Sequence, residues 1–421
     1  MKSPLALLKV VRRAKAAFFL VMALCFTLSG CWGKRELEER SLIELIGIDD
    51  GDIDRLKVTI TVAIPKAHSP ESGGPQGAAS FTLSGEGRDV LDAFVKLSAF
   101  GSRELTGSHT TMLILGEEFA KRDVSPIIDA FSRGIEVRPN TLVAVCRGKA
   151  NDFLRNLRSP EELTTADYLS KLVTYAYLTT GACPLVTAVD FVNRYQIIEA
   201  SPWAPYLDLA APQGEDTDDK GQTGASPKND SQNEGPKPGV VLGTAVFALQ
   251  QGQCKMVDYL DPEETRFALL MAGKAQNWFV TFDHPGDLHA TTLRVHHVNV
   301  RTKVKRHNDS VEAHFKVRLT CTLDEYVVNT QAQLPADKLR EVAAETMQKQ
   351  IVATAQSILK RLGEMESDVI GLGLSVHGTF LTYPEFAEFG WPSRLRTVKP
   401  TFDVRVQVFS TGLTFQRAFP Q

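Results

Sequence analysis

Cys31 is the residue whose position in the chain most clearly implies chemistry. It directly follows Leu28, Ser29 and Gly30, so two small residues stand before a thiol. A deprotonated thiol is a soft nucleophile that can form a thioether with a diacylglycerol. Small residues before it suit a peptidase that cuts at this point. The spacing predicts that Cys31 is acylated and becomes the first residue of the mature chain.

The residues before Cys31 have the order of an export signal. A segment with five basic residues and no acidic one is followed by an apolar run over residues 16–28. A helix needs roughly 20 apolar residues to span a bilayer, so this shorter run is typical of a signal peptide. Leu28-Ser29-Gly30-Cys31 resembles the bacterial lipobox. The alternative is an ordinary secretory leader. We expect a lipoprotein signal peptide over 1–30, and a lipidated Cys and charged stalk over 31–41.

Other residue types that could perform catalysis or bind metals do not form a recognisable pattern. The chain contains no H-E-x-x-H, P-loop or G-x-S-x-G motif. His296 and His297 are adjacent on a predicted strand and should point to opposite faces, so we interpret the local histidines as solvated. This cluster of six histidines over residues 284–314 consists of His284, His289, His296, His297, His307 and His314. We expect no catalytic, cofactor-binding or metal-binding residues, no cofactor and no enzymatic activity.

Glycines, cysteines and acidic pairs are interpreted as structural rather than ligand-binding or catalytic residues. Gly371-Leu372-Gly373 follows a helix rather than a strand, so it does not predict a nucleotide-binding turn. Gly243, Gly371 and Gly373 are expected at turns or close backbone approaches. Glu263-Glu264 and Asp218-Asp219 are expected in loops. Four widely spaced cysteines, which lack a C-x-x-C pair, are predicted to be buried small hydrophobes: Cys146, Cys183, Cys254 and Cys321.

The charge of the mature chain argues against nucleic acid as a partner. The full chain has 47 basic and 50 acidic residues, and the leader removes five basic ones. The mature part then holds 42 basic against 50 acidic residues, and nothing resembles a basic stripe. An apolar content of 43% is enough for real hydrophobic cores.

Hydrophobic periodicity predicts an α+β protein in which mixed sheets are flanked by helices. A strand over 311–323 should place Val311, Ala313, Phe315, Val317 and Leu319 on one face. Further strands are expected at 42–48, 56–64, 81–83, 111–115, 141–146, 206–209, 240–249, 280–282, 292–302 and 402–409. Helices are expected at 89–100, 117–121, from 125, at 151–157, 161–180, 188–198 and 336–362. In the last, Leu339, Ala343, Met347, Ile351, Ala355, Ile358 and Leu362 recur near helical spacing, and Gly363 is expected to end it.

A polar segment divides the mature chain. Residues 212–239 contain no large apolar side chain, which predicts disorder. The segment is either an interdomain linker or, as we prefer, the lengthened tip of a hairpin, since loop entropy grows slowly with length. The predicted regions are an N-terminal α/β region over 42–210 with one or two lobes, a disordered loop over 211–239 and a C-terminal α/β domain over 240–421.

Four groups of residues, taken in order, resemble the Ger(x)C lipoproteins of spore germination. The first is Cys31-Trp32, Glu36-Leu37 and Ile46-Gly47-Ile48-Asp49. The second is His109, Leu113-Ile114-Leu115-Gly116-Glu117, Ala120, Asp129, Arg133, Glu136 and Arg138. The third is Gly243-Thr244-Ala245-Val246-Phe247 with Leu260, Glu264 and Thr265. The fourth is Asp368, Gly371, Gly373 and Trp391. Gly33 stands where the family often has Asp, and the polar segment departs from the usual compact pattern.

The resemblance implies a non-enzymatic subunit, the C subunit of a nutrient germinant receptor. Such a subunit lies on the outer face of the inner spore membrane, held by acylated Cys31, and assembles with two integral-membrane subunits. The implied fold is an elongated array of three mixed α/β domains. The alternatives are a solute-binding lipoprotein of a transporter, which needs two similar lobes around a cleft, and an exported hydrolase. For Asp129, Arg133, Glu136 and Arg138, structural ion pairs are preferred over contacts with a partner subunit.

Overall fold

The computed structural model describes residues 15–20, 22, 40–64, 80–133, 137–210, 237–275, 278–282, 288–307, 310–328 and 336–411. The chain divides into two units, Met1–Ser41 and Leu42–Gln421. The elements below belong to the second unit, apart from the first two residues of its first strand. Cys31, most of the predicted signal peptide and stalk, and residues 211–236 of the polar segment lie outside the described residues.

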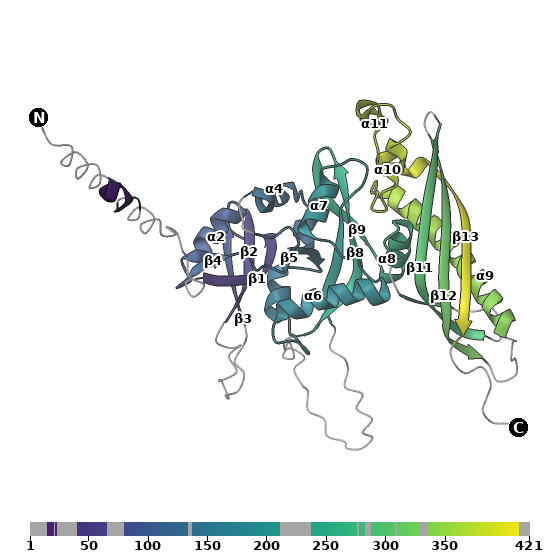
Figure 1. Cartoon of the computed structure of the whole chain (residues 1–421), viewed down its shortest axis with the longest axis horizontal. Coiled ribbons are helices and arrows are strands. Elements are labelled where there is room, and N and C mark those ends of the chain that lie inside the picture. The colour runs from purple at the N-terminus through teal and green to yellow at the C-terminus, as the bar shows by residue number, and fades with distance from the viewer. Residues whose placement is uncertain are drawn as a thin grey trace, which may run out of the picture. The chain divides into compact units, whose positions relative to one another are not determined.

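The larger of two sheets has nine strands, ordered β3-β2-β1-β5-β6-β7-β8-β9, with β4 also paired to β1 (Figure 1). Its strands are β1 (Arg40–Asp50), β2 (Leu56–Ala63), β3 (Ser80–Gly87), β4 (Glu104–Thr106), β5 (Met112–Gly116), β6 (Leu142–Cys146), β7 (Trp203–Leu209), β8 (Gly239–Gln250) and β9 (Gln253–Leu260). Strands β1, β5, β6 and β7 are parallel neighbours, and the pairs β1–β2, β2–β3, β7–β8 and β8–β9 are antiparallel.

Helices cover both faces of this sheet because its central strands are buried on both sides, as parallel strands usually are. On one face, Leu45 and Ile114 pack with α5 (Ala150–Asn156) and α6 (Thr165–Tyr175). On the other face, Ile46 and Leu115 belong to a core shared with other helices. These helices are α2 (Val90–Ser98), α3 (Glu117–Ala120), α4 (Ser125–Arg133) and α7 (Ala188–Tyr195).

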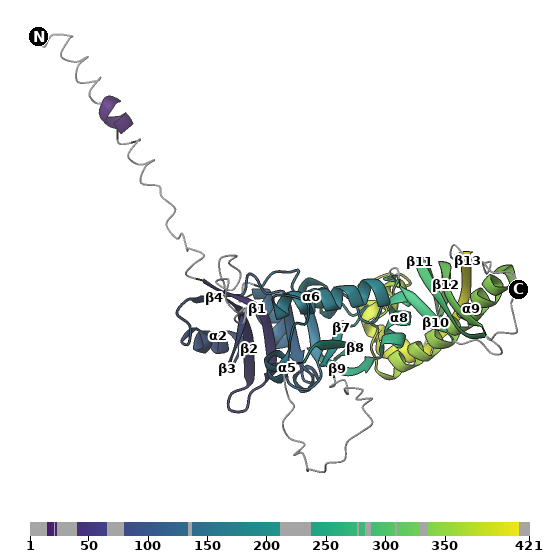
Figure 2. The same cartoon turned by 90° about the horizontal axis from the view of Figure 1, so that it is seen from below.

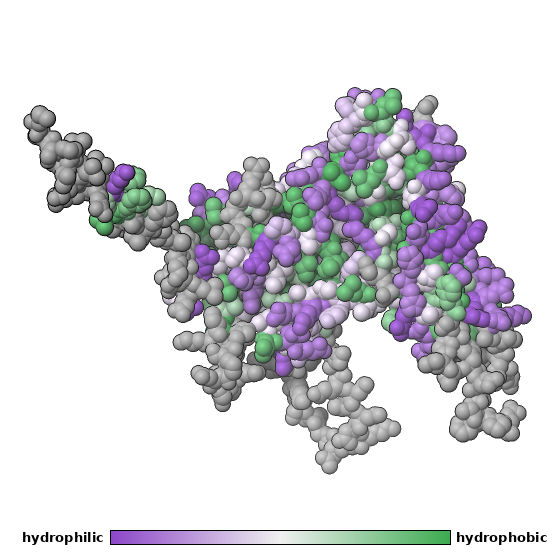
Figure 3. Space-filling model, in the orientation of Figure 1, coloured by the Kyte–Doolittle hydropathy of each residue, from purple (hydrophilic) through white to green (hydrophobic). Residues whose placement is uncertain are grey.

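The second sheet has four strands, ordered β10-β11-β12-β13. They are β10 (Phe279–Phe282), β11 (Leu288–Arg306), β12 (Val311–Val328) and β13 (Val398–Thr411). The long helix α9 (Ala336–Glu364) packs along one face of this sheet (Figure 2). The five residues predicted to share a face of β12 are all buried, and so are the seven periodic residues predicted in α9. The side of the molecule around β11 and β12 is hydrophilic in the view of Figure 3, as strand alternation requires.

Strands β7 and β8 pair antiparallel across residues 211–236, so the hairpin prediction is confirmed. Strands β8 and β9 thereby continue the larger sheet beyond the boundary predicted at residue 240. The remaining helical elements connect and flank the sheets: π-helical turn Ala176–Thr180, α8 (Pro262–Met271), α10 (Leu372–His377), α11 (Tyr383–Phe389) and 3-10 turn Ser393–Thr397.

Two local predictions are wrong. Glu263 and Glu264 lie in helix α8, not in a loop: Asp261 caps the helix, Pro262 is in its first turn, and Glu264 completes a capping box. Gly363 does not end α9, which continues to Glu364. A Cβ at Gly363 would lie 2.9 Å from the Cα of Arg396, so glycine here permits close packing of the backbone. In both cases neighbouring residues decide the structure: Asp261 and Pro262 start α8, and the Arg396 backbone packs against Gly363.

We expect Phe315→Ala to destabilise the protein by about 3–5 kcal/mol, because it opens a cavity in a close-packed core. Phe315 is 1% exposed and stacks on Phe402 with ring centroids 5.2 Å apart. The measurement is the free energy of unfolding of the full chain in denaturant. Lys316→Ala, one residue along the strand on the exposed face, is the matched control. Equal effects of the two substitutions would contradict the assigned faces of β12.

Candidate functional site

A buried carboxylate, Asp368, lies where the segment after α9 meets the larger sheet. Its side chain is fully buried. One carboxylate oxygen accepts the backbone N–H of Gly371 at 2.9 Å and of Leu372 at 3.0 Å. The other oxygen accepts the N–H of Gly373 at 2.6 Å and the indole N–H of Trp391 at 2.9 Å. All four motif residues predicted at this end of the chain therefore meet at one carboxylate.

The glycines around Asp368 serve backbone geometry, as the sequence predicts. Gly371 has φ +76, a left-handed conformation. A Cβ on Gly373 would lie 2.3 Å from the carbonyl oxygen of Glu199 and 2.4 Å from the Trp391 indole nitrogen. Gly243 has φ +132, and a Cβ there would lie 2.0 Å from the carbonyl oxygen of Leu260. A side chain would therefore clash at Gly373 and Gly243, whereas at Gly371 only the left-handed backbone favours glycine.

Backbone bonds join the Asp368 segment to the sheet. The Ser201 hydroxyl accepts the N–H of Asp368 at 2.9 Å, and the N–H of Ser201 donates to the Asp368 carbonyl at 2.9 Å. Arg194, on α7, donates to the carbonyls of Ser201 at 2.8 Å and Val369 at 2.9 Å. The Ser367 hydroxyl donates to the Phe247 carbonyl of β8 at 2.6 Å. We call this set, Asp368, Arg194, Ser201, Ser367 and Trp391, the junction.

Burial shifts the ionisable groups of the junction toward their neutral forms. It raises the pKa of Asp368, while the hydrogen bonds from Gly373, Leu372 and Trp391 and the nearby Arg194 oppose the rise. It lowers the pKa of Arg194, against the attraction of Asp368. Both groups hydrogen-bond to backbone of neighbouring segments, so the geometry suits the fixing of two backbone segments.

Two side-chain contacts extend the connection on either side of the junction. His377 of α10 lies 3.0 Å from Glu199, which is 6% exposed. Arg361 of α9 donates to Glu264 of α8 at 2.6 Å and to Asp258 of β9 at 2.8 Å. Although burial acts in the opposite direction, these hydrogen bonds raise the pKa of Arg361. The two contacts tie the C-terminal helices to the larger sheet.

Asp49 from the first group of motif residues and Gly116 from the second meet at the carboxyl ends of β1 and β5. Asp49, which is 3% exposed, accepts the backbone N–H groups of Ala150 at 2.7 Å and Asn151 at 2.8 Å. Burial nevertheless leaves the pKa of Asp49 raised. A Cβ on Gly116 would lie 2.0 Å from the Asp49 carboxylate. Ligands often bind at this edge in open α/β sheets, but here Asp49 binds the start of α5 instead.

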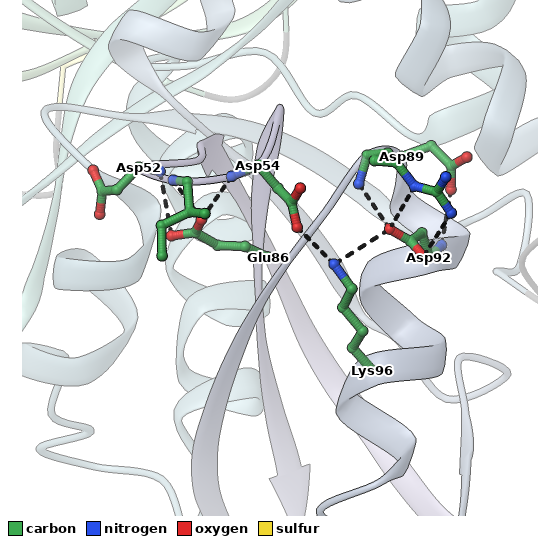
Figure 4. Close-up of polar contacts among 8 residues, drawn as sticks. Asp52, Asp54, Glu86, Asp89, Asp92 and Lys96 are labelled. Atoms are coloured by element: carbon green, nitrogen blue, oxygen red, sulfur yellow. Dashed lines mark hydrogen bonds and ion pairs between the residues drawn. The ribbon is translucent and has the colours of Figure 1, made fainter.

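A further carboxylate fixes the turn between β1 and β2 at the same edge. Glu86 of β3 accepts the backbone N–H groups of Asp52 at 3.2 Å, Ile53 at 2.8 Å and Asp54 at 3.0 Å (Figure 4). Lys96 of α2 lies 2.6 Å from the Asp54 carboxylate. Hydrogen bonds from Asp54 and Ile53 hold the pKa of Glu86 below its ordinary value. The turn is thereby rigid, and Ile53 is 94% exposed at its tip.

The structure also shows the environment of the predicted cysteines, of four histidines and of Arg138. The cysteines Cys146, Cys183, Cys254 and Cys321 are free and buried, which confirms that prediction. His296, His297, His307 and His314 are exposed, as expected for solvated histidines. Arg138 is exposed, and the side chains of Asp129, Arg133 and Glu136 lie outside the described residues. Within the part of the chain that the structure describes, no cluster of three or more metal-ligating side chains occurs.

Sequence reasoning did not find Arg194, Ser201, Glu199, Arg361 or Glu86. Arg194 and Val369 are separated by 175 positions, so no local pattern relates them. The position of Glu264 could have been predicted from the sequence, because Asp-Pro-Glu-Glu at 261–264 is a typical helix start. No helix among the described residues is long and apolar enough to cross a membrane.

Comparison with known proteins agrees with the motif assignment. Residues 33–209 match the family model of the spore germination protein N-terminal domain, and residues 242–412 match the spore germination B3/GerAC-like C-terminal model. Together the two models span most of the chain. The chain therefore belongs to the Ger(x)C family of spore germination proteins.

Individual relatives match different shares of the chain. Spore germination protein KC of Bacillus subtilis (strain 168) is 24% identical over 96% of this chain and 97% of its own. Spore germination protein B3 of the same organism is 23% identical over 40% of this chain and 44% of its own. The crystal structure of the GerBC protein matches with a TM-score of 0.50 at 14% identity, over 86% of this chain and 96% of that one. This likeness concerns the fold, and the α+β prediction with helix-flanked sheets is confirmed.

We expect Asp368→Asn to lower the free energy of unfolding by about 2 kcal/mol or more. The amide group would face N–H donors, so at least one buried donor loses its acceptor, at about 1–3 kcal/mol each. Chemical denaturation of the full chain measures the change. Asp337→Asn, an 89% exposed acid on α9, is the control and should leave stability nearly unchanged. A stability equal to the parent would show that the four donors do not depend on the carboxylate.

Glu86→Gln should lower the melting temperature at neutral pH and have progressively less effect in acid. The pKa of Glu86 in the folded protein lies below its ordinary 4.5, so the stabilisation by its carboxylate is present above pH 4.5. It is lost as the pH falls through the folded pKa. Melting curves of parent and variant from pH 7 to pH 3 should converge. Glu388→Gln, an exposed acid on α11, should show no such convergence, and a pH-independent effect of Glu86→Gln would refute the mechanism.

Proposed function

We propose that this protein is the lipoprotein C subunit of a spore germinant receptor, held by acylated Cys31 on the outer face of the inner spore membrane. The observation that carries the proposal is the match of both halves to the spore germination family together with Leu28-Ser29-Gly30-Cys31 after a short apolar run. The predicted partners are the two integral-membrane subunits of the receptor, and the response is nutrient-triggered germination.

The internal geometry supports a non-enzymatic role. The motif carboxylates Asp49, Glu264 and Asp368 each accept hydrogen bonds from within the chain. A catalytic acid or base must reach a proton on a substrate, whereas these groups fix helix starts and adjoining segments. Such a body is suited to holding a defined shape beside its partners. Acylation would confine it to the membrane surface and raise its effective concentration there.

Cys31→Ala should abolish acylation and leave an uncleaved or mislocalised precursor. Metabolic labelling with a tagged palmitate in the sporulating host measures incorporation, and fractionation measures location. Cys25→Ala is the matched control, because Cys25 lies in the segment predicted to be removed. It should retain the label in full. Equal labelling of the Cys31 variant and the parent would exclude Cys31 as the acylated residue.

The receptor assignment has a separate test. The affinity-tagged full chain, extracted from spore membranes in mild detergent, should co-purify with two integral-membrane germination proteins. A preparation in which acylation is intact and no membrane protein co-purifies would contradict the receptor assignment without affecting the lipoprotein assignment.

A further inference from the structure

Two phenylalanines near the start of the larger sheet are exposed to solvent. Phe100, just after α2, is 77% exposed, and Phe81, on the edge strand β3, is 44% exposed. The aromatic residues Trp203, Tyr206 and Phe247 of the same sheet are at most 1% exposed. Exposing two large apolar rings costs solvation free energy, so a surface that covers them is expected.

The two phenylalanines lie at the same end of the sheet. Phe81 is paired with Val62 in β2, and Val62 is paired with Ile43 near the start of β1. Strand β3 runs away from this end to Gly87, and α2 returns along it, with Leu97 packed at Gly85. The chain then passes Phe100 and enters β4, which pairs with β1. Phe81 and Phe100 therefore flank the end at which β1 begins.

This end is also where the chain comes from Cys31. Strand β1 starts at Arg40, nine residues after Cys31. A chain of nine residues reaches at most about 30 Å when fully extended. The opposite end of β1 is farther by the length of its 11 residues, about 35 Å. An acylated Cys31 thus keeps the end with Phe81 and Phe100 near the bilayer and leaves the Ile53 turn free to stay away from it.

We propose that Phe81 and Phe100 form a second membrane contact and insert into the interfacial layer of the bilayer that holds the acyl chains. The inference rests on the proposed acylation of Cys31. Burial of apolar side chains at the lipid boundary strengthens binding of a lipid-anchored protein. Arg103, exposed in the loop after Phe100, can extend its charged group to the headgroups while its stem lies beside the rings. The net negative charge of the mature chain makes apolar insertion, rather than attraction to anionic lipid, the source of the contact.

The two inserted rings would fix the orientation of the larger sheet relative to the membrane. A single lipidated residue on a stalk holds a protein near the membrane without selecting which face points toward it. Two rings on β3 and after α2 add contacts at defined positions of a folded sheet. The carboxyl edge of the sheet, with the Ile53 turn, would then point away from the bilayer.

The test places an environment-sensitive fluorophore at each end of β1. Full-length acylated protein carrying Phe100→Cys is labelled with a nitrobenzoxadiazole maleimide and reconstituted into phosphatidylcholine–phosphatidylglycerol vesicles. Ile53→Cys, at the 94% exposed turn, is the matched control. The native cysteines should not react, because Cys146, Cys183, Cys254 and Cys321 are buried and burial raises their pKa, for Cys183 and Cys321 to about 12.

In vesicles, the label at position 100 should shift to shorter wavelength and become shielded from aqueous iodide, and the label at position 53 should do neither. Phe81→Cys should behave as Phe100→Cys. Identical spectra at positions 100 and 53 in protein that floats with the vesicles would overturn the inference while the acylation stands. A shift seen only in spore membranes and absent in pure lipid would assign the rings to a protein partner. Protein that does not float contradicts the acylation, and the inference with it.

Discussion

The segment around buried Asp368 imposes the constraint on which the connection between the two sheets depends: its carboxylate fixes the turn before α10, and its backbone bonds to Ser201. A fully buried carboxylate is stable only where donors surround it, and four N–H groups do so here. Three come from the turn that starts α10 and the fourth from the Trp391 indole. The backbone of Asp368 itself pairs with Ser201. Any displacement of the turn from the segment before β7 would therefore leave several buried polar groups without partners at once, which makes the junction specific in its geometry.

Other motif side chains of this chain are likewise committed to internal contacts. Asp49 holds the start of α5, Glu264 completes the cap of α8, and Arg361 joins α9 to both α8 and β9. Their side chains are committed to backbone groups or to each other. A body assembled in this way presents a rigid surface, and its functional contacts are expected at its periphery, as proposed for Phe81 and Phe100.

Local periodicity predicted much of the fold. Alternation identified the buried face of β12, and helical spacing identified the seven core residues of α9. Both patterns arise because each element buries one face in the core and exposes the opposite face. The short strand β4, the edge strand β9 and helices α10 and α11 were missed. Strand β9 alternates only weakly, and α10 has six residues, so neither gives a long enough pattern. The start of helix α8 was predicted as a loop, although Asp261, Pro262 and Glu264 form a typical capping sequence.

By itself, the sequence determined the α+β class and the family, since these depend on local periodicity and on ordered motifs. The export signal and the acylation of Cys31 are predictions that rest on the sequence alone. The sequence also predicted backbone roles for Gly371, which has a positive φ, and for Gly373, where a side chain would clash. Only the tertiary structure decided what these positions surround. Arg194, Ser201 and Asp368 lie on segments separated by more than 160 positions, and the two phenylalanines are brought to one end of the sheet by strand register. Such contacts depend on how the elements pack in space, which no local pattern of residues encodes.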